Sequence, residues 1–272
     1  MMLETGFFDL DGTTIDENGR VYDGLSEALD SRHFVKTIIT ARGYTRFCNI
    51  TANNPCLAVT PGMPVGLENG ARIIDGETYD NIYHHPLSAD ERSAICDYIA
   101  TAEDLRYVTF HPRKSRPMMV LWSPDPDEAG CLRQANSHIA DVFTSDKGAL
   151  FKMIKQHSPG MVTCHTYSNE WRDLPEITTS YSSGTTVSFM PQGPTKGTAV
   201  QMIAEMKGLD LGSAMAAGND CNDISMLSLE ELGHPVVVGD MSAVMEAYLP
   251  DRTVYVHDPR QLGSFILQAI RP

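Results

Sequence analysis

The feature that most constrains the fold is an alternation of short apolar runs with helical patterns, which occurs in the first and last parts of the chain. In the first part, strands are expected at residues 6–10, 35–40 and 57–60, with helices at about 24–32 and 44–53 between them. Strands that alternate with helices predict a parallel sheet covered on both faces. The carboxyl ends of such strands lie along one edge, where ligands bind.

The last third of the chain repeats this rhythm. Strands are expected at residues 213–217, 235–238 and 253–256. Helices are expected near residues 196–207, 223–231, 242–249 and 261–270. Together the two parts predict one α/β domain with a doubly wound, Rossmann-like parallel sheet, formed by residues 1–82 and 191–272.

Residues 83–190 show a different order of elements, which predicts an inserted α+β domain. The capping box SADE at residues 88–91 starts a helix that continues to about residue 103. Strand-like runs follow at residues 106–111, 118–123, 140–144, 161–167 and 185–190. One more helical segment is expected near residues 126–138.

The charge balance limits the possible partners. Of the 272 residues, 21 are Lys or Arg and 35 are Asp or Glu, which gives a formal net charge of −14. Such a field repels a phosphate backbone, so we expect no nucleic-acid partner. A small phosphorylated substrate stays possible, because a local cation cluster or a metal can reverse the sign inside a cleft.

The six cysteines are scattered without a CxxC pair, which favours free thiols in a reducing cytosol over a zinc site or disulfides. The N-terminus has no basic segment followed by an apolar stretch, and no window approaches a membrane-spanning run. We therefore expect a cytoplasmic protein that has no membrane partner and is a monomer or a homodimer.

Two carboxylates stand two residues apart where the first apolar run meets a glycine turn, in FFDLDGTT at residues 7–14. Alternation along a strand places Asp9 and Asp11 near one side. Their repulsion favours a divalent cation or a shared proton. The alternative is a plain strand followed by an acidic turn, since Asp-Gly is common in turns. The whole string favours a chemical role, because charge is costly at the end of an apolar strand.

Two further segments offer groups that bind phosphate. Thr40 and Arg42 follow the second strand with a hydroxyl and a guanidinium, although an ordinary strand-to-helix connection would look the same. Lys196 opens an expected helix, where the positive end of the helix dipole disfavours a cation. Free amides and an ammonium group at that place can converge on a phosphate. A solvated lysine is the alternative.

A fourth segment, GNDCND at residues 218–223, ends an apolar strand and has four side chains with oxygen atoms in five positions. Asn and Asp oxygens are hard ligands that suit Mg²⁺. An N-capping turn is the alternative, but it needs only one such residue.

In their order, the four segments resemble the motifs of the haloacid dehalogenase superfamily, specifically its Mg²⁺-dependent phosphatases. The long insert between the second and third motifs looks like the type-two cap of the Cof-type and sucrose-phosphatase-like branch. The stretch ENGA at residues 68–71 also resembles that branch. The resemblance covers both core segments, whereas the insert matches only in position and size.

The resemblance implies a role for each matching residue. Asp9 would attack phosphorus and form an aspartyl phosphate, and Asp11 would act as the general acid and then as the base. Mg²⁺ would bind the Asp9 carboxylate and the Asp11 main-chain carbonyl. Thr40, Arg42 and Lys196 would hold the phosphoryl group.

The last motif departs from the family pattern. Related loops usually have Asp directly after the glycine, where this chain has Asn219 followed by Asp220. Either Asn219 binds the metal as a neutral ligand, or Asp220 takes that role through a shifted loop. With Asn222, Asp223 would complete the metal shell and orient Lys196.

The substrate beyond the phosphate is less evident from the sequence. A basic cluster in the insert contains Arg113, Lys114 and Arg116, which would bind a second anionic group or sugar hydroxyls. A solvated hairpin loop is the alternative. We therefore predict a Mg²⁺-dependent phosphatase for a small metabolite such as a sugar phosphate. The alternatives are a phosphotransferase or mutase with the same aspartyl phosphate, and a non-catalytic binding protein on this scaffold.

Overall fold

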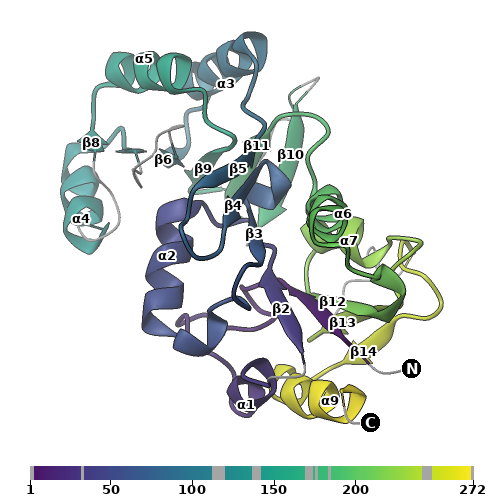
Figure 1. The fold of residues 1–272 in the computed structure, drawn as a ribbon. Helices are drawn as coiled ribbons and strands as arrows, with labels where there is room; N and C mark the ends of the chain where they lie inside the picture. The colour runs from purple at the N-terminus through teal and green to yellow at the C-terminus, as the bar shows by residue number, and fades with distance from the viewer. Residues whose placement is uncertain are drawn as a thin grey trace. The chain divides into compact units, whose positions relative to one another are not determined.

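The computed structural model describes residues 3–31, 34–111, 120–136, 142–168, 174, 177–182, 185–240 and 247–270. Its contacts divide the chain into two compact units (Figure 1). Unit 1 comprises Met1–Ala41, Ile50–Ile82 and Thr195–Pro272, and unit 2 comprises Arg42–Asn49 and Tyr83–Pro194. That residues 1–82 and 191–272 form a catalytic core and residues 83–190 a cap stays a prediction.

Unit 1 contains a five-stranded sheet in the order β14-β13-β12-β1-β2, and all its neighbouring strands are parallel. Its strands are β1 (Thr5–Phe8), β2 (Val35–Ile38), β12 (Ala214–Gly218), β13 (His234–Val238) and β14 (Val254–Val256). Phe8 is in register with Ala217 of β12 on one side and with Ile38 of β2 on the other, so these three neighbouring strands end at nearly the same level. This confirms the predicted parallel α/β fold, and it brings the residues that follow these strands to one edge.

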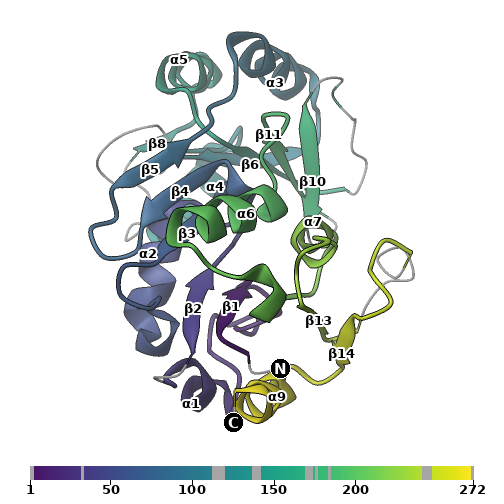
Figure 2. The same cartoon turned by 45° about the vertical axis from the view of Figure 1, so that its right-hand side comes forward.

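The helices of unit 1 follow the expected order. They are α1 (Leu25–Leu29), α6 (Lys196–Lys207), α7 (Ile224–Leu227), α9 (Leu262–Ala269) and the second part of α2 (Tyr44–Asn53). Helix α1 packs against α9, and α6 packs against α7, as both views show (Figures 1 and 2). Of the helix expected at 242–249, residues 242–246 lie outside the described part of the chain.

The strand predicted at residues 57–60 is wrong. Pro55 starts a 3-10 helical turn that ends at Leu57, whose side chain is fully buried. The strand comes later, as β3 (Pro64–Leu67), and β4 (Arg72–Asp75) and β5 (Asn81–His84) complete a three-stranded sheet that the sequence analysis missed. A single parallel bridge from Ile39 to Gly66 brings β3 beside the end of β2.

Unit 2 contains a six-stranded sheet in the order β10-β11-β9-β6-β7-β8, which is antiparallel except for the β7–β8 pair. The strands are β6 (Leu105–Phe110), β7 (Val120–Trp122), β8 (Val142–Thr144), β9 (Val162–Thr166), β10 (Thr178–Ser182) and β11 (Thr186–Met190). Its helices are α3 (Ala89–Thr101), α4 (Pro126–Asn136) and α5 (Lys147–His157). This is an α+β arrangement, as predicted for the insert.

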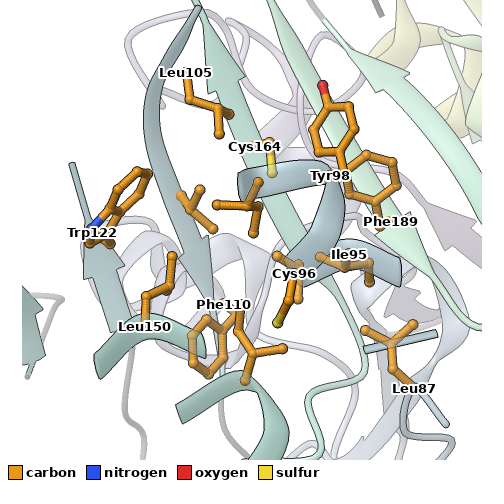
Figure 3. Close-up of a cluster of buried hydrophobic side chains, with 14 of the residues drawn as sticks. Leu87, Ile95, Cys96, Tyr98, Leu105, Phe110, Trp122, Leu150, Cys164 and Phe189 are labelled. Atoms are coloured by element: carbon orange, nitrogen blue, oxygen red, sulfur yellow. The ribbon is translucent and has the colours of Figure 1, made fainter. Parts of the chain in front are cut away.

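An apolar cluster between α3, α5 and the sheet forms the core of unit 2 (Figure 3). Tyr98 of α3 meets Phe189 of β11 edge to face, with 5.0 Å between ring centroids. Leu150 and Ile154 of α5 are both fully buried. Helix α5 was not predicted, although these two residues are four positions apart and Asp146 caps the helix by accepting from Gly148 N.

Within the described residues, no helix combines the length and the apolar character that crossing a membrane requires.

Candidate active site

A buried ion-pair triad lies at the carboxyl edge of the parallel sheet. Asp9 directly follows β1, and its backbone N–H donates to Ala217 O of β12 at 3.0 Å, which continues the strand pairing. Lys196 begins α6, and its Nζ donates to Asp9 Oδ1 and to Asp223 Oδ1, each at 2.6 Å. All three side chains are buried. The fold therefore brings together three of the segments that the sequence analysis singled out.

Two carboxylates share one ammonium group in this triad, so it holds an excess of negative charge. Burial raises the pKa of Asp9 to about 7, with the negative charge of Asp223 acting in the same direction and Lys196 opposing it. Burial alone would lower the pKa of Lys196, but the charges of Asp223 and Asp9 hold it above its ordinary value. Lys196 is therefore a protonated cation, and the triad carries a net negative charge when both carboxylates are ionised.

The loop after β12 is organised around Asp223. Its Oδ2 accepts from the backbone N–H of Asn219 at 2.9 Å and of Asp220 at 3.0 Å, while its Oδ1 accepts from Lys196. Gly218 is required at the strand end, because a Cβ there would lie 2.5 Å from the Asp223 side chain. The Asp220 side chain accepts from Cys221 N at 2.6 Å and so caps its own 3-10 turn.

Asn219 links this loop to the first motif. Its Oδ1 accepts a hydrogen bond from Thr13 Oγ1 at 3.0 Å. Gly12 has a φ of +79°, and a Cβ at that position would lie 2.3 Å from Asn219 Nδ2. The turn after Asp9 therefore needs glycine both for its backbone conformation and for the close approach of Asn219. Asp11 lies in this turn and is exposed.

The other predicted site residues do not all lie in the unit that holds the triad. Thr40 is fully buried in unit 1, where its N–H donates to Gly66 O at 2.9 Å. Arg42 is the first residue of unit 2 and is not part of the unit that holds the triad. The remaining three predicted residues lie outside the described part of the chain: Arg113, Lys114 and Arg116.

The oxygen atoms of the residues at this edge are of the chemical type that Mg²⁺ prefers. No group of three His, Cys, Asp or Glu side chains with metal-ligand geometry occurs among the described residues. Mg²⁺ does not need one, since it is commonly bound through one or two carboxylates and keeps several waters. The Asp9 carboxylate, the Asp11 carbonyl and the Asn219 amide oxygen supply hard donors next to uncompensated negative charge.

The sequence analysis assigned no role to the turn that follows β3. Asn222 Nδ2 donates to Asn69 Oδ1 at 3.1 Å, and Glu68 forms a buried ion pair with Arg72. The only available signal was the stretch at residues 68–71, which was noted as a point of resemblance and not as part of the site.

Comparison with known proteins identifies the family. The profile of the haloacid dehalogenase-like hydrolase family matches residues 7–249, so the chain belongs to this family and is a hydrolase. The family recognised from the sequence motifs is thereby confirmed. The HMP-PP phosphatase of Serratia proteamaculans (strain 568) is 32% identical over 88 residues, a match that spans 32% of this chain and 31% of that protein. The chain thus matches less than a third of the length of this relative.

Several solved structures share the whole fold. A haloacid dehalogenase-like hydrolase from B. subtilis has a TM-score of 0.75 at 17% identity and covers 97% of this chain and 99% of its own. A sugar phosphatase of HAD subclass IIB has a TM-score of 0.73 at 18% identity, with 97% of both chains covered. A protein from Thermotoga maritima has a TM-score of 0.73 at 16% identity, with 98% and 97% covered. At such identities these similarities establish the fold.

Proposed function

We propose that this protein is a Mg²⁺-dependent phosphatase that hydrolyses a small phosphorylated metabolite through an aspartyl-phosphate intermediate. The observation that carries the proposal is the buried Lys196 between Asp9 and Asp223, at the edge where parallel sheets bind ligands. An ammonium group beside a strand-end carboxylate allows that carboxylate to face an anionic substrate.

The proposed reaction has two steps, both centred on Asp9. In the first step Asp9 attacks phosphorus, the bond from phosphorus to the leaving oxygen breaks, and Asp11 donates a proton to that oxygen. In the second step water attacks the phosphorus of the aspartyl phosphate and Asp11 takes a proton from that water. The bond between the Asp9 oxygen and phosphorus breaks, so inorganic phosphate leaves and the Asp9 carboxylate is restored. Thr40 and Lys196 hold the phosphoryl oxygens during both steps.

A magnesium ion would reduce the repulsion between the Asp9 carboxylate and the phosphate. We assign its protein ligands to the Asp9 carboxylate, the Asp11 carbonyl and the Asn219 side chain. Asn219 is favoured over Asp220 because its amide oxygen lies within reach of Thr13 in the first motif, whereas the Asp220 side chain caps its own turn. Asp223 is proposed to hold Lys196 and the loop amides, since both of its oxygens are already engaged there.

For the substrate we propose a sugar phosphate. One relative is an HMP-PP phosphatase, and one structural neighbour is a sugar phosphatase. Both names indicate small phosphorylated compounds. We propose that residues 83–190 form a cap domain that recognises the remainder of the molecule, with Arg113, Lys114 and Arg116 as its anion-binding groups. Arg42, which follows the second strand, is proposed to bind the phosphoryl group with Thr40. The cytoplasmic location and the monomeric or homodimeric state stay predictions.

The test is to incubate the purified protein with a panel of phosphorylated sugars and polyols and to measure released phosphate. Release is expected with Mg²⁺, and it should stop with a chelator and return when Mg²⁺ is added in excess. NMR of the products separates a phosphatase from a mutase, since a mutase yields an isomerised phosphate ester. Activity that survives chelation would refute the metal assignment. Absence of turnover on every compound would favour a binding protein.

A further inference from the structure

Beside the proposed catalytic groups, residues 68–70 form a turn in the left-handed region of the backbone. The φ angles of Glu68, Asn69 and Gly70 are 53°, 52° and 95°. For residues other than glycine this conformation costs on the order of 1 kcal/mol each, and consecutive instances are rare. All three residues are buried, so the surrounding structure holds the turn in this conformation.

The turn contacts three segments of the proposed site. The N–H of Asn69 donates to Thr40 O at 3.1 Å, and its Oδ1 accepts from Asn222 Nδ2 at 3.1 Å. Gly70 lies against the start of α6, where a Cβ would be 2.2 Å from Thr195 O. Thr195 is the N-cap of the helix that begins with Lys196. One turn thus meets the segments that supply the phosphate-binding hydroxyl, the lysine and the loop carboxylate.

A buried ion pair joins the beginning of the turn to β4. Glu68 Oε1 lies 3.4 Å from Arg72 Nη2, and the two side chains are only 1% and 3% exposed. Neither carboxylate oxygen of Glu68 has a hydrogen-bond partner among the described residues. A buried pair with such incomplete hydrogen bonding is weak evidence for a gain in stability, and we infer that this pair fixes the geometry of the turn.

We propose that Asn69 is a positioning residue for phosphoryl transfer, acting through its hydrogen bond to Asn222. This inference rests on the proposed function. Asn222 directly precedes Asp223 in the 3-10 turn Cys221–Asp223, and Asp223 holds both Lys196 and the amides of the loop. Without the contact from Asn69, the loop can move by a fraction of an ångström and take Lys196 with it. Errors of that size at a reacting centre lower turnover more than they lower binding.

The experiment is a double-mutant cycle of Asn69→Ala and Asn222→Ala, with kcat and KM measured on the best substrate of the panel. We expect kcat to fall about tenfold or more in each single variant while KM changes less, as for lost preorganisation. The double variant should be no slower than the slower single variant, since all three lack the same contact. Asn69→Asp keeps an acceptor for Asn222 and should recover most of kcat. Asn81→Ala, at an exposed asparagine of the same unit, serves as the control.

A second readout does not depend on turnover. The backbone amide signals of Asn219 and Asp220, which donate to Asp223, should shift in the NMR spectrum of Asn69→Ala and not in that of Asn81→Ala. Unchanged amide signals, an unchanged kcat, or single effects that multiply in the double variant would each overturn the inference. Failure of the proposed function would instead appear in the wild-type protein as the absence of phosphate release, and the amide signals would still decide whether Asn69 positions the loop.

Discussion

Both units bury hydroxyl side chains, but the described residues of only one unit include buried charged side chains. Among the described residues, every buried Asp, Glu, Lys or Arg belongs to unit 1: Asp9, Lys36, Glu68, Arg72, Lys196 and Asp223. The buried polar side chains of unit 2 are hydroxyls and a histidine: Thr109, His111, Ser123, Thr163, Thr166 and Ser188. Unit 1 thus buries charged side chains, which is energetically costly, and the described part of unit 2 does not.

This contrast shows how a site can be distinguished from a core. Burying a charge is unfavourable unless it is paired and hydrogen bonded, so its retention calls for a reason. Lys36 has a structural one, because its Nζ donates to the carbonyl oxygens of Leu29 and Cys56 at 2.7 and 2.6 Å. Burial alone therefore does not mark the site. What separates Asp9, Lys196 and Asp223 from Lys36 is that their segments converge at the carboxyl ends of neighbouring parallel strands.

The largest effect is expected for Asp9→Asn, which tests whether the buried charge of unit 1 is catalytic. A carboxamide is not a competent nucleophile, so kcat should fall by at least about 10⁴-fold in the phosphate-release assay. Asp251→Asn, at an exposed position of unit 1, should retain full activity. Near-normal turnover of Asp9→Asn would show that the triad has a structural role and not a catalytic one.

Stability tests the same contrast without using activity. Lys196→Met keeps the apolar stem but leaves the buried Asp9 and Asp223 carboxylates without their cation. Removing one partner of a buried pair typically costs about 3–5 kcal/mol. Lys152→Met in unit 2 removes an exposed charge, and its expected effect is within about 0.5 kcal/mol. Urea unfolding followed by circular dichroism measures both changes, and equal effects would show that buried charge plays no special part in unit 1.

Most of the parallel sheet could be predicted because its strands are apolar and its helices have clear limits. Helices α2 and α6 begin and end at the residues expected from the sequence. The strand at 57–60 was wrong because an apolar run of that length does not distinguish a strand from a buried turn, which Pro55 starts here. The β3–β5 sheet was missed because it depends on pairing between neighbouring segments, which no single segment reveals.

The candidate site also has residues that the sequence could predict and contacts that it could not. Asp9 and Asp223 could be selected because they follow apolar strands, and Lys196 because a cation is unfavourable at the start of a helix. The structure brings these three together. The contact between Asn69 and Asn222 could not be predicted, since the two residues are 153 positions apart and either side chain would suit an ordinary turn. Residue types identify candidate chemical groups, but only the fold shows which groups support them.

In unit 2, His165 provides a test through pH. Burial, together with the positive charges of Arg46 and Arg106, lowers the pKa of His165 to about 3. An unfolded histidine titrates near 6.5, so the unfolded chain binds more protons between these values, and stability falls as the pH decreases through that window. At pH 5 the loss relative to pH 7 should be about 2 kcal/mol.

The measurement is urea unfolding at pH 7 and pH 5, followed by tryptophan fluorescence. Trp122 is buried in the core of unit 2, so its fluorescence reports on the unfolding of that unit. His165→Gln should reduce the difference between the two pH values, whereas His85→Gln, at an exposed histidine, should leave it unchanged. An identical pH dependence in wild type and His165→Gln would show that unit 2 gains its acid sensitivity elsewhere.

The smallest expected effect concerns Asn219, where unit 1 has one charge fewer than related loops. Asn219→Asp would restore that charge while keeping an oxygen that accepts from Thr13. We expect Mg²⁺ to bind about tenfold more tightly, which corresponds to about 1.4 kcal/mol, as measured by calorimetry. If Asp220 is the ligand instead, Asp220→Asn will weaken Mg²⁺ binding and Asn219→Asp will not strengthen it. Asn18→Asp adds a charge at an exposed turn of the same unit and should change the affinity little, because solvent and salt screen it.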